Sequence, residues 1–285
     1  MFVGSAVIFA GVVALLLVGV LRQRGEDTPP KGSPGYRFVA VLGLIVPAVI
    51  LVLLFILSID AIPATSPSSS NHGLTVDVVA RQFFWDVSYP GRGIRSANEI
   101  HIPVGVPVNV RVTSGDVIHS LWVPALNRKV DVIPGRTNVV TFDANRAGRF
   151  RGQCAEFCGP EHAEMALYVI AQPRASFNAW LADESHPNTI PTSAELERGQ
   201  QIFLGSDCEY CHRIAGTNAS GTIGPDLTHI GSRTSLAAGT IPNTPGGLAG
   251  WIIDPQHIKP GNKMPGTSLD GSQLQALVAY LESLR

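Results

Sequence analysis

The sequence predicts a multidomain chain with a transmembrane helical hairpin, an all-β sandwich and an all-α domain, in that order. Two uncharged apolar runs, 1–21 and 38–59, each reach the roughly 20 residues that a helix needs to cross a bilayer. Period-two alternation begins at Leu74, and helical periodicity returns only after residue 192. The expected parts are a transmembrane hairpin over 1–61, a linker over 62–73, a β domain over 74–172, a linker over 173–192 and an α domain over 193–285.

The composition agrees with membrane attachment. Only 15% of the 285 residues are charged and the mean hydropathy is +0.19, which the two apolar runs account for. The net charge of −1 offers no basic footprint, so no nucleic-acid partner is expected.

The first apolar run has an alternative interpretation, a cleaved secretory signal. No basic segment precedes it and no small-residue cleavage site follows it, which favours a membrane span. The second run contains Pro47, which membrane helices tolerate. The segment between the runs carries Arg22, Arg24, Lys31 and Arg37, so the positive-inside rule places it in the cytoplasm. Everything after Asp60 is then expected on the periplasmic side.

The two globular parts differ in their patterns. Val106, Val108, Val110 and Val112 alternate with polar residues, and short runs of this kind between Pro and Gly turns predict a small sandwich or barrel. In the last part, Thr192 or Ser193 can cap a helix that continues to Leu204. A second helix follows Asp270, with an apolar stripe at i, i+3, i+4 and i+7 formed by Leu274, Leu277, Val278 and Leu281.

The four cysteines form two pairs, each beside a histidine, which favours cofactor sites over disulfides. The second pair reads Cys208-Glu-Tyr-Cys211-His212, the C-x-x-C-H pattern of covalent haem attachment. His212 is the expected axial ligand, and Met264 is the expected ligand of the opposite face, since His/Met ligation suits electron transfer. His229 and His257 are rivals for that face, although both are expected at the surface.

Two other interpretations of the second pair are weaker. A thioredoxin-like motif needs a βαβ context that is absent from the sequence, and a zinc site lacks a partner pair. With a helix on each side of the motif, this part resembles a class I cytochrome c. Gly224-Pro225-Asp226-Leu227 stands where that family has the loop that supports the histidine ligand.

The first pair belongs to Cys154-Ala-Glu156-Phe-Cys158-Gly-Pro-Glu-His162-Ala-Glu-Met165, with His119 upstream. Thiolate, imidazole and thioether are soft ligands that suit copper, and a second cysteine in the loop lets two thiolates bridge two ions. Three alternatives remain: a zinc site that leaves Met165 unused, a disulfide, and a copper chaperone of thioredoxin fold, which the strand-rich pattern does not suit.

Together these motifs resemble cytochrome c oxidase subunit II of the caa3 type, which has a transmembrane hairpin, a cupredoxin domain with a binuclear CuA centre and a fused C-terminal cytochrome c domain. The resemblance implies that Cys154 and Cys158 bridge two copper ions, with His119 and His162 as terminal ligands. Met165 and the main-chain carbonyl of Glu156 are the implied weak ligands. It also implies a bacterial inner-membrane protein with its copper and haem domains in the periplasm.

The resemblance extends to two less specific sites. The side chain of Glu156, with Asp131, would reach a magnesium or manganese ion at the border with subunit I; a solvated surface role is the alternative for Asp131. Electron entry is expected near Trp85 and Phe83. Phe83 replaces the tryptophan that receives electrons in many relatives, so entry at this position differs from the family pattern.

The implied function is an electron relay. Electrons would pass from a donor such as cytochrome c or a bc complex to the haem, then to the copper centre, then to haem in subunit I. Oxygen reduction and proton translocation would take place in that partner, with subunit III also in the complex. The small subunit of a copper-containing nitric oxide reductase and a copper-delivery or redox-sensing protein are the alternatives. A quinol oxidase subunit is disfavoured, since those relatives lack the copper ligands.

Overall fold

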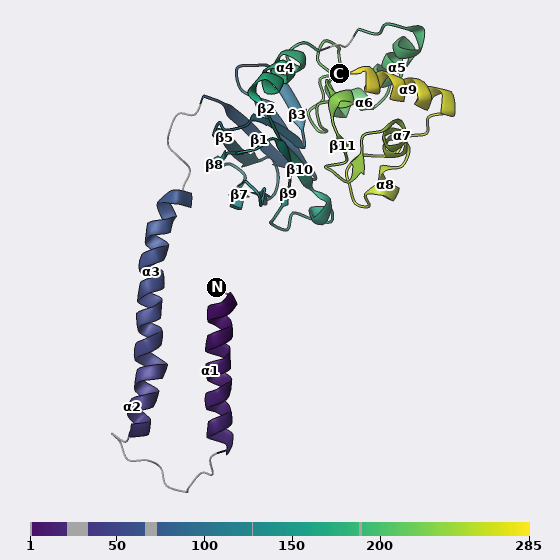
Figure 1. Ribbon diagram of the computed structural model, residues 1–285. Helices are drawn as coiled ribbons and strands as arrows, with labels where there is room; N and C mark the ends of the chain where they lie inside the picture. The colour runs from purple at the N-terminus through teal and green to yellow at the C-terminus, as the bar shows by residue number, and fades with distance from the viewer. Residues whose placement is uncertain (1, 22–33, 66–72, 127, 188–189) are drawn as a thin grey trace. The chain divides into compact units, whose positions relative to one another are not determined.

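The computed structural model describes residues 2–21, 34–65, 73–126, 128–187 and 190–285 (Figure 1). The chain forms two compact units, Met1–Ser66 and Pro67–Arg285, which are treated separately. The second unit contains both globular parts, and hydrogen bonds connect them.

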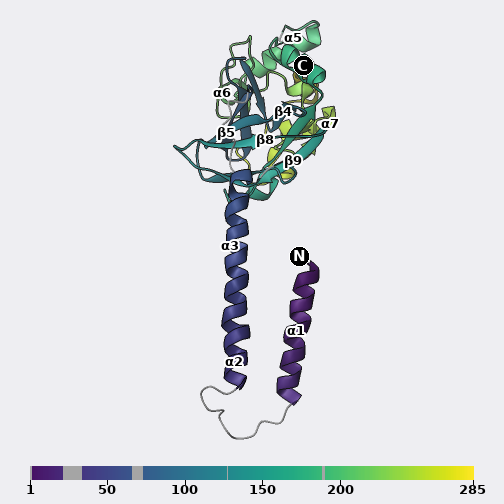
Figure 2. The ribbon, with the colours of Figure 1, turned by 60° about the vertical axis from the view of Figure 1, so that its left-hand side comes forward.

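The first unit is helical. Helix α1 spans Phe2–Leu21, and a continuous helix is built from α2 (Pro34–Ala40), the π-helical turn η1 (Val41–Ile45) and α3 (Val46–Thr65), as both ribbon views show (Figures 1 and 2). The predicted linker therefore begins as helix. The basic residues Arg22, Arg24 and Lys31 lie outside the described residues.

One described helix is long and apolar enough to cross a membrane. It covers Arg37–Ile59, 23 residues with a mean hydropathy of 3.2, and none of its most apolar window is buried. The apolar part of the first helix, Ser5–Gly19, is shorter among the described residues. The apolar surface of Arg37–Ile59 is left uncovered by the rest of the unit, which makes this helix a candidate membrane span.

The π turn in the long helix has a local cause. Pro47 has no N–H to donate to the preceding turn, and its ring crowds the carbonyl four residues earlier. The N–H of Val46 instead reaches the carbonyl of Val41, five residues back. Widening by one residue keeps the helix continuous without a strong kink. Ser58 also satisfies its hydroxyl inside the apolar helix, by donating to the carbonyl of Leu54 at 2.7 Å.

The β domain is a sandwich of two five-stranded sheets, in agreement with the predicted all-β architecture. The first sheet has the order β3-β2-β1-β5-β8 and the second β4-β10-β9-β6-β7. The pairs β1/β5 and β10/β4 are parallel, and the other pairs are antiparallel. The strands are β1 Thr75–Arg81, β2 Phe84–Tyr89, β3 Ile94–Ala97, β4 Glu99–Pro103, β5 Val108–Ser114, β6 His119–Trp122, β7 Val130–Val132, β8 Asn138–Phe142, β9 Gly148–Cys154 and β10 Ala166–Gln172.

Alternation along the strands builds the core between the sheets. In β1 every second residue is buried, as it is in β2. Val76, Val110 and Val169 are fully buried members of the resulting cluster, and so is Met165 of the metal-ligand loop. The sites at the ends of these strands are therefore fixed to a closely packed core.

The segment 173–192, predicted as a linker, contains a helix instead. Helix α4 spans Arg174–Glu184, and its residues Phe177 and Leu181 join the core of the β domain. Trp180 stacks on His101 with ring centroids 4.1 Å apart. The i, i+3, i+4 spacing of these three apolar side chains makes one packed face, which explains why this segment is helical.

The last domain is helical around a cavity, as predicted, with one small two-stranded sheet. Ser193 caps α5 and Asp270 forms a capping box at the start of α9. Helices α5 and α9 cross closely at Gly199. The elements are α5 Ala194–Leu204, α6 Cys208–Cys211, η3 Ile230–Ser232, β11 Ser235–Leu236, β12 Ile241–Pro242, α7 Pro245–Ile253, α8 Pro255–Ile258 and α9 Gly271–Ser283.

Candidate metal and haem centres

Two strands and one loop build the metal-ligand cluster. Strand β9 ends at Cys154, the loop returns through the short helix η2 (His162–Glu164) into β10, and β6 begins at His119. The N–H of Cys154 donates to the carbonyl of Met165 at 2.9 Å, which closes the base of the loop. Gly159 has φ +131, and a Cβ there would meet the ring of Phe83 at 3.0 Å, so this turn requires glycine.

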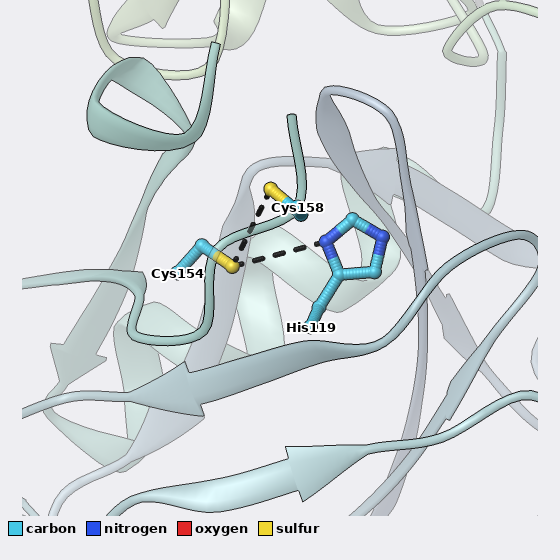
Figure 3. A group of neighbouring side chains, drawn as sticks. All are labelled: His119, Cys154 and Cys158. Carbon is cyan, nitrogen blue, oxygen red and sulfur yellow. Dashed lines mark hydrogen bonds between the residues drawn. The ribbon is translucent and has the colours of Figure 1, made fainter. Parts of the chain in front are cut away.

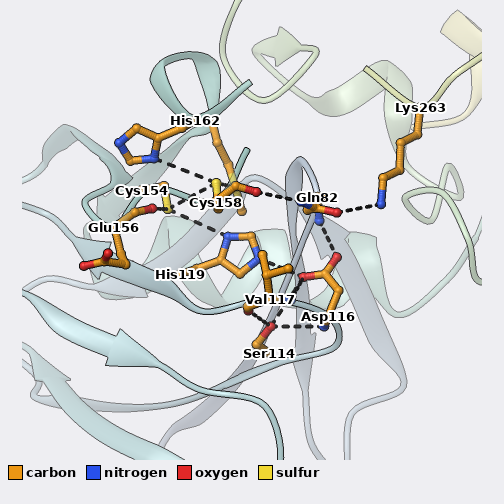
Figure 4. Close-up of polar contacts among 11 residues, drawn as sticks. Gln82, Ser114, Asp116, Val117, His119, Cys154, Glu156, Cys158, His162 and Lys263 are labelled. Atoms are coloured by element: carbon orange, nitrogen blue, oxygen red, sulfur yellow. Dashed lines mark hydrogen bonds and ion pairs between the residues drawn. The ribbon is translucent and has the colours of Figure 1, made fainter. Parts of the chain in front are cut away.

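The structure brings all six predicted copper residues together. Figure 3 draws His119, Cys154 and Cys158, and Figure 4 adds Glu156 and His162. The sulfur atoms of Cys154 and Cys158 are 3.8 Å apart. Each has its own imidazole: His119 Nδ1 lies 3.8 Å from Cys154 Sγ, and His162 Nδ1 lies 3.8 Å from Cys158 Sγ. Met165 Sδ is 3.9 Å from Cys158 Sγ, and the Glu156 carbonyl oxygen is 3.2 Å from Cys154 Sγ.

These donors fit a bridged metal pair. The sulfur–sulfur separation of 3.8 Å far exceeds the roughly 2.05 Å of a disulfide bond. Neighbouring donors about 3.8 Å apart can share an ion bound at roughly 2.0–2.3 Å from each. Each cysteine sulfur has one imidazole beside it. The Met165 thioether and the Glu156 carbonyl complete the set. Soft thiolate and thioether ligands select copper, and a zinc site would have no use for Met165.

Hydrogen bonds within the cluster shift the pKa values of its members. A hydrogen bond from Cys158 lowers the pKa of the Cys154 thiol to about 3, and the same bond raises the pKa of Cys158. Burial opposes charge on His119, but its hydrogen bonds to Cys154 and Asp116 outweigh burial and raise its pKa. A metal needs both sulfurs as thiolates and both imidazoles neutral, so its binding is coupled to the release of the protons that Cys158 and His119 retain.

Asp116, whose position the sequence does not reveal, contacts the cluster through His119. Its Oδ1 lies 2.8 Å from His119 Nε2, and its Oδ2 accepts the backbone N–H of Gln82 at 2.7 Å. A carboxylate on Nε2 fixes the tautomer of His119 with its Nδ1 lone pair toward Cys154. The only signal in the sequence is the i, i+3 spacing to His119, which is too common to be informative.

Gln82 connects this cluster to the helical domain, as Figure 4 shows. Its Nε2 donates to the carbonyl of Cys158 at 2.6 Å, and its Oε1 accepts from Lys263 Nζ at 2.9 Å. Lys263 precedes Met264, so one side chain contacts the metal-ligand loop and the segment of the predicted haem ligand.

The residues of the predicted magnesium site lie on neighbouring segments. Asp131 in β7 is paired with Ser120 in β6, and the carbonyl of Ser120 accepts the N–H of Ala155, next to Glu156. The side chains of Asp131 and Glu156 are both exposed. They are therefore available to a partner surface, and Phe157 beside them is 75% exposed.

The two aromatic residues predicted near electron entry are inside the sandwich. Trp85 is fully buried, and its ring centroid lies 6.2 Å from that of His119. Phe83 is 8% exposed and packs beside Gly159. Because both rings are buried, a soluble donor could not contact either of them directly.

The haem motif lines a cavity of the helical domain. Cys208, His212 and Met264 line the same cavity. Cys208 and Cys211 are the two ends of the one-turn helix α6, and both thiols are free. Most other residues around the cavity are apolar, as a haem face requires.

The loop after the motif holds His212 as the resemblance implies. His212 Nδ1 donates to the carbonyl of Pro225 at 2.8 Å, which leaves Nε2 for an iron ion. Burial lowers the pKa of His212, so the imidazole stays neutral as a ligand must. A Cβ on Gly224 would lie 2.6 Å from His212 Cε1, so the loop can approach the ring only with glycine there.

The prediction of a surface position is wrong for His229. Its side chain is buried and its Nε2 lies 3.9 Å from Glu184 Oε2 of α4. Packing between α4 and the helical domain, which the sequence does not reveal, covers it. His257 is exposed, as expected. Neither lines the cavity that contains His212 and Met264.

Taken together, a β sandwich with a soft-ligand cluster, a helical domain with a haem-attachment cavity and an apolar anchor define a membrane-attached electron-transfer protein of the copper and haem class. Residues 91–172 match the family described as cytochrome c oxidase subunit II, periplasmic domain, and residues 196–285 match cytochrome c.

Relatives cover nearly the whole chain. Cytochrome c oxidase subunit 2 of Alkalihalophilus pseudofirmus is 34% identical over 99% of this chain and 83% of the relative. The Bacillus subtilis protein of the same name is 31% identical over 95% of this chain and 81% of the relative. The crystal structure of the periplasmic domain of subunit II of cytochrome oxidase of Bradyrhizobium japonicum is similar to 40% of this chain and 94% of that chain, at 32% identity and a TM-score of 0.39. The chain belongs to the cytochrome c oxidase subunit II family.

Membership confirms the predicted function class. The chain is an electron-transfer subunit of a haem-copper oxidase with a fused cytochrome c domain. The β domain has the cupredoxin-like fold, and the two families imply copper in that domain and haem in the last one. Family membership also implies a complex with subunit I and a membrane-associated protein with a periplasmic domain. The comparisons do not favour the nitric oxide reductase or copper-delivery alternatives.

Proposed function

We propose that this chain carries electrons from an external donor to the haem held by Cys208, Cys211 and His212, and from there to a two-copper centre in the β domain. The centre passes them to haem in subunit I, where oxygen is reduced to water. One observation carries the proposal: two cysteine sulfurs 3.8 Å apart, each with an imidazole at 3.8 Å, beside a thioether and a carbonyl.

Specific roles follow from this arrangement. Cys154 and Cys158 bridge the copper ions, His119 and His162 are terminal ligands, and Met165 and the Glu156 carbonyl are weak ligands. A bridged pair spreads one charge over two ions, which keeps the structural change on reduction small. The chain's own contribution is a rigid, buried ligand set, since Cys154, Cys158, His119 and Met165 are all buried.

In the helical domain, His212 and Met264 are the proposed axial ligands. Asn262 Oδ1 accepts the N–H of Met264 at 2.8 Å, and Gln256 Nε2 donates to its carbonyl at 3.2 Å. These two contacts hold the segment of Met264 at the cavity that His212 also lines. A thioether ligand raises the haem potential and closes the iron to small ligands, which suits an electron relay.

The surroundings of the subunit complete the proposal. Two helices, α1 and the segment Arg37–Ile59, cross the bacterial inner membrane with the basic loop in the cytoplasm and the copper and haem domains in the periplasm. The exposed Glu156 and Asp131 face subunit I and bind a magnesium or manganese ion at that border. Subunit III belongs to the same complex, and the donor is a cytochrome c or a bc complex.

Substitution of a bridging thiolate tests the relay in the assembled oxidase. In Cys158→Ser we expect the haem to be reduced by the donor as before, while oxygen consumption is lost and haem absorption stays reduced under air. Glu164→Gln changes an exposed side chain of the same loop and serves as the control, with oxygen consumption retained. Normal oxygen consumption by Cys158→Ser would overturn the proposed path.

A further inference from the structure

The cavity of the haem domain has one wall that comes from the β domain. Asn98, between β3 and β4, lines the same cavity as His212 and Met264. Next to it, Glu99 Oε1 accepts the backbone N–H of Thr234 at 2.9 Å and also the Thr234 hydroxyl. Glu99 is 2% exposed, so this contact is part of a buried interface within the second unit.

The lining of the cavity also contains buried polar groups that have no partner among the described residues. These are Arg233 Nε and Ser235 Oγ. Leaving a buried polar group unpaired is costly, so a ligand with acceptor oxygens is expected here. The carboxylates of a haem would meet this requirement. Asn98 lines the same cavity as these two groups.

Asn98 is held rigidly against Trp85. Its Oδ1 accepts the N–H of Trp85 at 2.8 Å, and its own N–H donates to the carbonyl of Trp85 at 2.9 Å. Its carbonyl accepts the N–H of Tyr168 at 2.8 Å. The backbone of Asn98 has φ 61, a left-handed conformation that asparagine adopts more readily than most residues. Side chain and main chain thus form one fixed link between the cavity and β2.

Trp85 extends this link to the metal cluster. The indole is fully buried, and its centroid lies 6.2 Å from the His119 ring, whose Nδ1 lies 3.8 Å from Cys154 Sγ. Asn98, Trp85 and His119 therefore form a continuous buried series from the haem cavity to a thiolate.

We propose that Asn98 is shared by the two centres: it closes the haem cavity at its carboxylate edge and, through Trp85, forms the bridge by which electrons reach His119. The inference rests on the proposed function and adds a positioning residue to it. The transfer moves one electron from the reduced haem to the oxidised copper centre, and no bond forms or breaks and no proton is needed.

A second connection between the two globular domains, through Lys263 and Gln82, can be compared with the connection through Asn98. Lys263 reaches the carbonyl of Cys158 through Gln82, but the lysine side chain is exposed and long. Because its amine is at the exposed surface, this contact is expected to contribute little. Lys263→Met removes this link and leaves Asn98 intact.

Four variants of the intact oxidase separate these possibilities. Asn98→Gly suits the positive φ but removes the side chain. Asn98→Asp keeps an acceptor for the N–H of Trp85, but it replaces the amide donor with a negative charge. Thr234→Val weakens the neighbouring domain contact without changing Asn98. Lys263→Met is the fourth variant. For each variant we would measure the haem midpoint potential and the EPR spectrum of the copper centre. The third measurement is the first-order rate of haem-to-copper electron transfer after flash reduction of the haem.

We expect Asn98→Gly to slow the transfer several-fold while the copper EPR spectrum is unchanged. Asn98→Asp should keep the rate and lower the haem midpoint potential, since added negative charge favours the oxidised haem. Thr234→Val and Lys263→Met should leave the transfer rate and the haem midpoint potential close to those of the wild type. The inference fails if Asn98→Gly and Asn98→Asp behave as wild type, or if Thr234→Val or Lys263→Met slows the transfer as much as Asn98→Gly. A wild-type protein without haem or without a copper signal would instead refute the proposed function itself.

Discussion

Asp116 is a single carboxylate that orients His119, a proposed metal ligand. It accepts from His119 Nε2 and is itself held by the backbone N–H groups of Gln82 and Val117 at 2.7 Å each. Burial raises its pKa, but these hydrogen bonds outweigh burial and lower the pKa below the usual aspartate value. The carboxylate is therefore charged at neutral pH and keeps Nδ1 of His119 directed at Cys154.

Asp116→Asn tests this role. We expect a loss of copper affinity of about 10–100-fold, the usual effect of removing a partner that orients a ligand. Competition with a copper chelator measures the affinity. Asp77→Asn is the matched control, because Asp77 pairs with Arg111 on the surface of β1 at 2.6 Å. Equal affinities for the two variants would show that Asp116 does not orient His119.

Glu184 predicts a specific pH dependence of stability. Burial raises its pKa from 4.5 to about 7, and its Oε2 has no hydrogen-bond partner among the described residues. The folded chain keeps this proton between those pH values while the unfolded chain loses it, so the free energy of unfolding falls as pH rises through the window. His229 and Arg233 face this carboxyl from the helical domain.

In Glu184→Gln this fall should be absent. We expect the variant to match wild type near pH 4.5 and to exceed its free energy of unfolding by about 3 kcal/mol above pH 7. Urea unfolding at several pH values, followed by tryptophan fluorescence, gives the comparison. Parallel pH profiles for the two proteins would mean that Glu184 titrates at an ordinary value.

The proposed ligand residues can be recognised in the sequence, whereas the residues that contact and orient them cannot. Cys154, Cys158 and Met165 are rare residue types at distinctive spacings, so their chemistry is visible in the sequence. Asp116 and Asn98 belong to common polar types, and their roles arise only from contacts made in the folded domain. Their burial and partners depend on strands that are distant in sequence.

At the level of elements, the crossing of α5 and α9 depends on one glycine. A Cβ on Gly199 would lie 2.1 Å from the carbonyl oxygen of Ala276 and 2.6 Å from Tyr280 Cβ. No rotation of a flexible side chain relieves a clash with backbone, so the helices would have to separate.

Gly199→Ala should therefore lower the free energy of unfolding by about 1–3 kcal/mol, the usual cost of overpacking. Chemical denaturation followed by the haem absorption band measures it. Gly246→Ala provides the control, since a Cβ at this position in α7 meets nothing within 4 Å. That substitution should be neutral or stabilising by up to about 1 kcal/mol. A stable Gly199→Ala variant would contradict the close crossing.

Helices and strands were predicted best where the apolar periodicity and the capping or turn residues indicate the same element. The strands from Leu74 onward and the helix after Asp270 follow their periodicity closely. Helix α4 was missed because its apolar face is short and lies next to a Pro-containing polar segment. The π turn before Pro47 has no sequence signal beyond the proline itself.

At the level of the molecule, the two globular domains are docked by buried contacts. Lys259 Nζ donates to the carbonyls of Glu164 at 2.9 Å and Ala237 at 3.1 Å, and it lies 4.0 Å from Glu161 Oε2. Lys259 and Glu161 are 2% and 4% exposed at the side chain. Because these groups are shielded from mobile ions, salt screens them far less than surface pairs.

Electron transfer from haem to copper should accordingly be independent of ionic strength. Flash reduction of the haem at low and at high salt measures its rate. Reduction of the haem by a soluble donor, which has to diffuse to the surface, provides the contrast and should vary with salt. If the haem-to-copper rate also fell with salt, the domains would have to be linked by a mobile tether rather than by a fixed interface.

The arrangement of the domains could not be predicted from the sequence. The hydrogen bond between Glu99 and Thr234 joins residues 135 positions apart, and that between Gln82 and Lys263 joins residues 181 apart. Periodicity and motif spacing describe local structure and contain no information on such pairs. The burial of His229 was mispredicted for the same reason.

The central claim is that one chain carries a bridged copper pair and a covalent haem, and EPR spectroscopy of the purified, copper-loaded protein tests it most directly. We predict a mixed-valence signal from one electron shared by two copper ions, beside the signal of a low-spin haem. A single-copper signal, or a copper-free protein with a Cys154–Cys158 disulfide or bound zinc, would contradict the account.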